Sequence, residues 1–386
     1  MPAPAGAVEP PFVDQHCHSI LRTWASPADS GWRGCFTEGR LRQSLERDVP
    51  ASSGYREFLI AFARWVGSPA DEGSALAARQ SALRDDGSAY LRRLLDDAGV
   101  AALLVDTGFG GDAYIAPAEL AEVVGRPVRT IGRLEPLLES VLRGDLRPRS
   151  LIDEIDMRLR EALDTGVVGF KSAAAYRCGL ALRRPSAANL MLALEDRLGQ
   201  SRRVTDVTLI SAAVWTAAEL GAERGVPLQF HTGFGDSDLH LPDADPTLLR
   251  DLFRDERAEG CPIVLLHCYP FVSQAAYLAS VYPQVHVDLS LAIPLLGAMA
   301  GRRAIADALA LCPWTKLLAA SDGHSYPEMH WRGALLWRES LADVFATELL
   351  AERMDAAHAS VVSAGILGAN ARRLFDLTSA STSMPA

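Results

Sequence analysis

The chain has 386 residues, of which 49% are hydrophobic and 22% charged, a composition typical of a globular protein with a large core. Its 38 basic and 48 acidic residues give a net charge of -10 at pH 7, and no basic stripe stands out, so we expect no nucleic-acid partner. No apolar run is long enough to span a bilayer, and segment 1–11 lacks the basic and apolar regions of a signal peptide, so we expect a cytoplasmic protein with no membrane partner.

Eight short apolar runs recur along the chain, as expected of strands that are buried on both faces. The predicted strands are Phe12–Ser19, Ala101–Thr107, Thr130–Leu134, Val167–Ser172, Pro227–Thr232, Pro262–Cys268, Val285–Leu291 and Lys316–Ser321. Helical spacing of apolar residues marks the segments Glu135–Arg143, Ser150–Asp164, Leu209–Arg224, Thr247–Ala258, Ser273–Ser280 and Gly301–Ala310. This alternation predicts an α/β fold, a (β/α)8 TIM barrel that forms one domain over residues 1–386.

Two connections are longer than a simple crossover helix needs. Residues 20–100, between the first two strands, are rich in aromatic residues and show helical patterning in Tyr55–Val66 and Leu76–Leu95. We predict that they form a helical insertion over the barrel mouth, and that Tyr176–Val207 covers the same mouth. The predicted closing helices are Trp331–Phe345, Thr347–Ala356 and Val361–Phe375.

Side chains that can bind a metal stand at or near the ends of five predicted strands. They are His16 and His18 on the first strand, Lys171 on the fourth, His231 on the fifth, His267 on the sixth and Asp322 after the eighth. A lone histidine among apolar residues is usually a core residue, but the C-terminal ends of barrel strands meet at one mouth. We therefore expect these side chains to converge there.

Imidazole and carboxylate groups suit a catalytic Zn²⁺, and Mn²⁺ or Fe²⁺ are compatible with them. Such an ion acidifies water and polarises a carbonyl group. Asp322 fits a general base that takes a proton from water and later returns it to the leaving group. Lys171 can be a ligand only as a carbamate, and the alternative is an ammonium group that binds a substrate carboxylate.

Three further residues are candidates for substrate binding. Tyr176 and Arg177 follow the fourth strand and could bind a carboxylate, although a surface salt bridge is the alternative for Arg177. His324 lies two residues after Asp322 and could reach the substrate. Asp14 precedes His16 by two residues, so strand alternation predicts that it points the same way and supports a ligand; the alternative is that it is a partner for a buried backbone group.

Longer sequence motifs resemble those of a known family, and the resemblance runs from about Phe12 to about Phe375. The motifs are Gly169–Leu180, Pro227–Asp236, and Asp322-Gly323-His324 with Pro327-Glu328. The chain resembles the amidohydrolase superfamily of metal-dependent hydrolases. Within that superfamily it is similar to proteins related to the N-terminal half of nodulin/glutamine-synthetase-like fusions, some of which are thought to hydrolyse γ-glutamyl amides.

The resemblance implies a ligand set. His16, His18 and Asp322 would hold one Zn²⁺, His231 and His267 a second, and carbamylated Lys171 would bridge them. One branch of the superfamily uses a single ion, and there His16, His18, His231 and Asp322 would be the ligands and His267 would be catalytic. We favour two ions because of Lys171.

We therefore predict a metal-dependent amidohydrolase that cleaves a non-peptide C–N bond in a small molecule such as a γ-glutamyl or other carboxylate-bearing amide. The alternative enzyme is a single-metal non-oxidative decarboxylase or C–C lyase of the same superfamily. A non-catalytic binding barrel is disfavoured because no ligand is missing. A homo-oligomer is compatible with the sequence.

Overall fold

A computed structural model describes residues 10–25, 29–109, 111–144, 147–197 and 203–377. Its single sheet has eight parallel strands paired in chain order: β1 (Phe12–Cys17), β2 (Val100–Asp106), β3 (Val128–Arg133), β4 (Val167–Ser172), β5 (Leu228–His231), β6 (Ile263–Leu266), β7 (Val285–Asp288) and β8 (Leu317–Leu318). Backbone hydrogen bonds from Asp322 N to His16 O, 3.1 Å, and from His18 N to Gly323 O, 2.8 Å, join the segment after β8 to β1. The predicted (β/α)8 barrel is confirmed.

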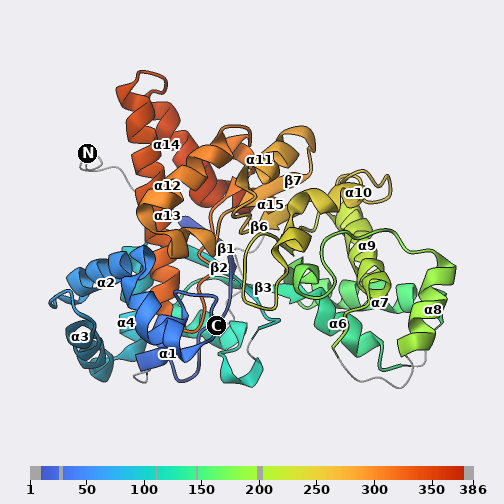
Figure 1. Ribbon diagram of the computed structural model, residues 1–386, viewed down its shortest axis with the longest axis horizontal. Helices are drawn as coiled ribbons and strands as arrows, with labels where there is room; N and C mark the ends of the chain where they lie inside the picture. Colours follow the sequence, from blue (N-terminus) through green and yellow to red (C-terminus); the bar gives the residue numbers. More distant parts are fainter. Residues whose placement is uncertain (1–9, 26–28, 110, 145–146, 198–202, 378–386) are drawn as a thin grey trace, which may run out of the picture.

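The helices surround the strands in groups (Figure 1). α1–α4 lie on one side of the barrel and α6–α9 on the opposite side. The helices are α1 (Asp29–Gly34), α2 (Ser53–Val66), α3 (Glu72–Asp85), α4 (Gly87–Asp97), α5 (Pro117–Val124), α6 (Leu134–Val141), α7 (Pro148–Asp164), α8 (Ala187–Arg197), α9 (Val207–Arg224), α10 (Arg250–Phe253), α11 (Val272–Val281), α12 (Ala292–Leu309), α13 (Pro327–Leu350), α14 (Ala356–Ala364) and α15 (Asn370–Leu374). None of those in the described residues is both long and apolar enough to cross a membrane.

Several predicted helix bounds were wrong for identifiable reasons. The stretch Leu76–Leu95 is two helices, because the Asp86 side chain accepts a hydrogen bond from Ala89 N and caps a new start for α4. Within Thr247–Ala258 only the four-residue α10 is α-helical. The two segments predicted from Trp331 to Ala356 are largely one helix, α13, followed by α14.

The barrel interior has an apolar floor. Val13, Leu104, Ile131, Val264 and Leu318 belong to one buried cluster inside the strands. Because side chains alternate along a strand, Asp106 and Arg133, two positions after Leu104 and Ile131, project into the same interior at the C-terminal end. That layer is polar, and it forms the candidate site.

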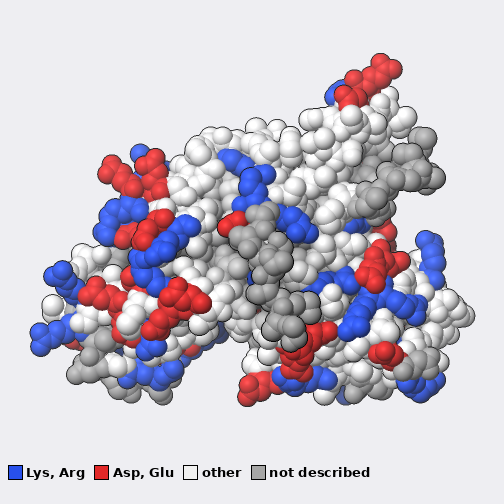
Figure 2. Space-filling view, turned by 180° about the vertical axis from the view of Figure 1, so that it is seen from behind, with Lys and Arg blue, Asp and Glu red and all other residues white. Residues whose placement is uncertain are grey.

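The surface shows no large field of one sign on the face in Figure 2. Lys and Arg side chains lie beside Asp and Glu over the described residues of that face. This mixture agrees with the absence of a basic stripe in the sequence.

Candidate metal centre

The six predicted metal ligands converge at the C-terminal end of the barrel. Asp322 Oδ1 lies 3.1 Å from His16 Nε2 and 3.5 Å from His18 Nε2, and Lys171 Nζ lies 2.9 Å from His16 Nε2. The His267 ring centroid is 5.6 Å from that of His16 and 4.5 Å from that of His231.

Left-handed backbone turns bring two of these residues into the site. His267 and Asp322 follow β6 and β8 with φ angles of 69° and 51°, a region that costs non-glycine residues roughly 1–3 kcal/mol. Contacts on both sides hold the turns: His267 N donates to Asp288 Oδ1 at 3.0 Å, and Asp322 N donates to His16 O. Such strain is typical of functional sites.

Hydrogen bonds fix the orientation of three imidazoles. Nδ1 of His16 lies 3.1 Å from Gln229 Oε1, Nδ1 of His18 lies 3.2 Å from the Asp106 carbonyl oxygen, and Nδ1 of His267 lies 3.0 Å from Ser290 Oγ. A carbonyl oxygen can only accept, so Nδ1 of His16 and of His18 carries the proton and Nε2 carries a lone pair. The lone pairs face the centre of the site.

Burial keeps His18, His231 and His267 neutral. It lowers the pKa of His18 and of His267 to about 3, and it lowers the pKa of His231 well below its usual value. Neutral imidazole is the form that binds a metal.

The donor set fits a metal ion. Asp322 Oδ1 and His231 Nε2 are buried and have no hydrogen-bond partner among the described residues. Ligand atoms of His16, His267 and Asp322 lie within 4.8 Å of one another. Two acceptors that face each other, such as His16 Nε2 and Asp322 Oδ1, are stabilised by a cation between them.

Two charged residues of the site were missed by the sequence interpretation. Asp106, at the end of β2, lies 3.3 Å from Lys171 Nζ and forms an ion pair with Arg133, at the end of β3. Burial alone would raise the Asp106 pKa, but Arg133 and Lys171 hold it well below its usual range. Burial lowers the pKa of Lys171 while Asp106 opposes this, so the lysine is ion-paired in a dry environment.

The candidate substrate-binding residues lie in different surroundings. The Tyr176 ring is 4.6 Å from the His231 ring, beside the ligands. His324 Nδ1 lies 2.9 Å from Ser325 Oγ, and its ring is 6.0 Å from Phe109. Arg177 donates to Glu139 Oε1 at 2.7 Å and to Val204 O at 3.0 Å, which is the salt-bridge alternative.

Asp14 takes the alternative role, as a partner for a buried backbone group. Asp14 accepts hydrogen bonds from Ser321 N at 2.8 Å and from Ser321 Oγ. The β1–β2 register shifts between Asp14 and Cys17, so the side-chain alternation breaks there. Asp14 therefore supports the turn that carries Asp322, not the imidazole.

Two cavities lie at the mouth. Cys35 and Phe36, between β1 and β2, line a narrow one with Asp322 and His324. A cavity of about 370 Å³ lies beside Asp106 and is lined by residues that include Ser19, Phe109 and Tyr114. Whether the whole segment 20–100 covers the mouth stays a prediction.

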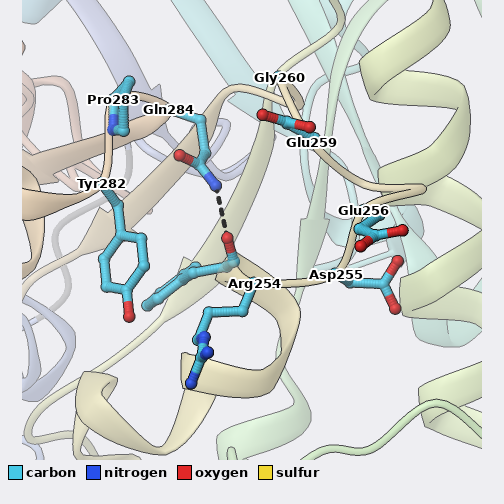
Figure 3. A pocket seen from close by; sticks show the side chains of 9 residues that line it. Arg254, Asp255, Glu256, Glu259, Gly260, Tyr282, Pro283 and Gln284 are labelled. Atoms are coloured by element: carbon cyan, nitrogen blue, oxygen red, sulfur yellow. Dashed lines mark hydrogen bonds between the residues drawn. The ribbon is translucent and has the colours of Figure 1, made fainter.

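A further cavity, of about 640 Å³, lies at the other end of the barrel (Figure 3). It is lined by residues that lead into β6 and β7, and Gln284 Nε2 donates to Phe253 O at 2.9 Å across it. It contains none of the predicted ligands, so its size does not make it the catalytic site.

Comparisons with known proteins agree with this geometry. Residues 148–377, more than half of the chain, match the amidohydrolase family. A protein from Lactobacillus casei ATCC 334 described as a metal-dependent hydrolase is 30% identical, with 96% of each chain covered and a TM-score of 0.82. His16 and His18 lie outside the family match.

More distant relatives extend the comparison. Protein fluG of Emericella nidulans is 27% identical over 399 residues, which cover 95% of this chain and 46% of that protein, so the chain spans about half the length of this curated relative. The uronate isomerase of Thermotoga maritima is 13% identical, with 95% of this chain and 94% of that chain covered and a TM-score of 0.66. The glucuronate isomerase of Caulobacter crescentus is 15% identical, with 96% and 92% covered and a TM-score of 0.65. The two isomerases are similar in fold alone.

Proposed function

The chain belongs to the amidohydrolase family, and on this basis we propose that it cleaves a non-peptide amide bond of a small, carboxylate-bearing molecule. The observation that carries the proposal is the buried set of imidazoles around Asp322, whose Oδ1 has no hydrogen-bond partner among the described residues. γ-Glutamyl amides are the first substrates to test, because the sequence motifs around Lys171 and His231 resemble those of proteins that are thought to hydrolyse them. We place the reaction in the cytoplasm.

The ligand assignment is part of this proposal. His16, His18 and Asp322 would hold one Zn²⁺, His231 and His267 a second, and carbamylated Lys171 would be a ligand of both. When bound, the metal supplies Lewis acidity, which acidifies water and polarises the amide carbonyl.

The chain's own residues would move the proton and position the substrate. Asp322 takes a proton from the attacking water at a carboxylate oxygen and returns it to the amine that leaves. Burial raises the pKa of Tyr176, so its hydroxyl stays protonated and can donate a hydrogen bond to the substrate beside His231. Gln229 and Ser290 keep the imidazoles of His16 and His267 in place.

One observation favours the single-metal alternative. Lys171 Nζ lies 3.3 Å from Asp106 Oδ2, and an ammonium group held by a carboxylate does not bridge metals. In that case His16, His18, His231 and Asp322 would hold one ion, and His267 would act in decarboxylation or C–C cleavage.

A metal and substrate screen tests these functions together. Purified protein is analysed for Zn, Mn and Fe per chain and is then assayed for amine release from γ-glutamyl amides and for CO₂ release from carboxylic acids. Amine release that EDTA abolishes and Zn²⁺ restores supports the hydrolase. CO₂ release without amine release would favour the alternative, and a chain without stoichiometric metal or turnover would be a binding barrel.

A further inference from the structure

Arg133 presents an unused hydrogen-bonding edge at the barrel mouth. Its Nε donates to Asp106 Oδ1 at 3.2 Å and its Nη2 donates to Asp106 Oδ2, so the carboxylate occupies the edge of the guanidinium formed by Nε and Nη2. This uses two of the five N–H groups. Nη1 has no partner within the described part of the chain, and 15% of the side chain is exposed. The end of the guanidinium, formed by Nη1 and the second Nη2 proton, can therefore take another carboxylate.

The surroundings hold this arginine in place. Gly108 N donates to Asp106 Oδ1 at 2.8 Å, and the loop after β2 lies directly on Arg133. A Cβ atom at Gly108 would lie 2.6 Å from Arg133 Cβ, so only glycine permits this approach. A side chain fixed before binding loses less conformational entropy when it takes a ligand.

The local charges leave room for an anion. Asp106 is shared by two cations, Arg133 and Lys171. The next carboxylate, Glu135, directs Oε1 to Ser172 Oγ at 2.8 Å and to Ala173 N at 2.7 Å. No ion pair joins Glu135 to Arg133 among the described residues.

We propose that Arg133 determines specificity by binding the carboxylate of the substrate end-on, in a bidentate pair beside the metal centre. Arg133 pairs in register with Lys171 on the neighbouring strand, so the bound carboxylate lies at the ligand layer. This rests on the proposed function and deepens it: the substrate's acyl part carries a carboxylate remote from the scissile amide. Arg177 does not bind the substrate carboxylate, because its guanidinium already donates to Glu139 Oε1 and Val204 O.

Two ligands of nearly equal shape test the proposal. 5-Oxohexanoate has one carboxylate and one methyl ketone, whereas heptane-2,6-dione has two methyl ketones, and neither has an amide bond that the enzyme could cleave. Calorimetric titration of the metal-loaded protein gives the ratio of their Kd values, and metal content is measured on each sample. The variants are Arg133→Met, Arg133→Lys and Arg177→Met. Arg133→Lys keeps the positive charge but loses the paired N–H donors of the guanidinium. Arg158→Met is the matched control, since Arg158 lies on the surface of α7 with Glu154 and Glu161.

The wild type should prefer 5-oxohexanoate, and Arg133→Met should reduce this preference about 10- to 100-fold at unchanged metal content, as expected for a lost hydrogen-bonded charge pair. Arg133→Lys should lie between them, and it carries the test if Arg133→Met does not fold. An unchanged ratio in both variants, no preference in the wild type, or loss of preference in Arg177→Met instead would overturn the proposal. Because binding is measured without turnover, a failed amide screen would count against the hydrolase alone.

Discussion

Arg79 and Glu328 form a buried ion pair that ties α3 to the start of α13, six residues after Asp322. Their side chains are 3% and 0% exposed, and Tyr90 Oη adds a hydrogen bond to Glu328 Oε1 at 2.6 Å. Arg79→Met keeps an apolar stem of similar length but leaves the Glu328 carboxylate without its cation. Removing one partner of a buried pair costs about 3–5 kcal/mol, and we expect that loss in the free energy of unfolding.

The double variant Arg79→Met/Glu328→Met sharpens this prediction. It removes both charges, so it should be more stable than Arg79→Met alone, although it has lost more polar contacts. Arg158→Met is the exposed control and should change the free energy of unfolding by no more than about 1 kcal/mol.

Urea unfolding followed by circular dichroism measures all three variants. The protein is kept in EDTA so that metal binding does not contribute. A loss below about 1 kcal/mol in Arg79→Met, or a double variant as unstable as the single one, would refute the reasoning that an unpaired buried carboxylate dominates the cost.

Three other predictions concern the site and its stability. Asp322→Asn should lower kcat by about 10²–10⁴-fold while the protein stays folded, because an amide oxygen cannot take the proton; near-normal kcat would remove the general-base role. Lys171→Ala should lose much of the second metal, and bicarbonate should speed Zn²⁺ reactivation of the wild-type apo-protein; full metal content and indifference to bicarbonate would instead support an ammonium group. Burial lowers the His286 pKa to about 4, whereas a histidine in the unfolded chain has a pKa of about 6.5. Between these two pH values only the unfolded chain takes up the proton, so the free energy of unfolding should fall as the pH drops from about 6.5 to about 4. His286→Gln should flatten that slope in denaturation midpoints measured across this range, and equal slopes would contradict it.

The sequence by itself determined the barrel and most of the candidate metal centre. Eight apolar runs alternating with helical segments allow few other folds, and parallel strands bring their C-terminal ends to one mouth whatever the details of packing. His16, Lys171, His231 and Asp322 could therefore be placed together without any knowledge of distances. Asp106 and Arg133 were also within reach, because each stands two positions after an interior residue, Leu104 and Ile131, on its strand.

Only the tertiary structure decided which partners these side chains take. A register shift in β1 between Asp14 and Cys17 breaks the alternation that the sequence predicts, so His16 and Asp14 differ in direction, and Asp14 accepts a hydrogen bond from Ser321 N. Arg177 and Arg133 are equivalent in the sequence, both being arginines near strand ends. Arg177 forms an ion pair with Glu139, whereas Asp106 occupies only the Nε edge of the Arg133 guanidinium. Such choices depend on contacts between residues that are distant along the chain, and local periodicity carries no information about them.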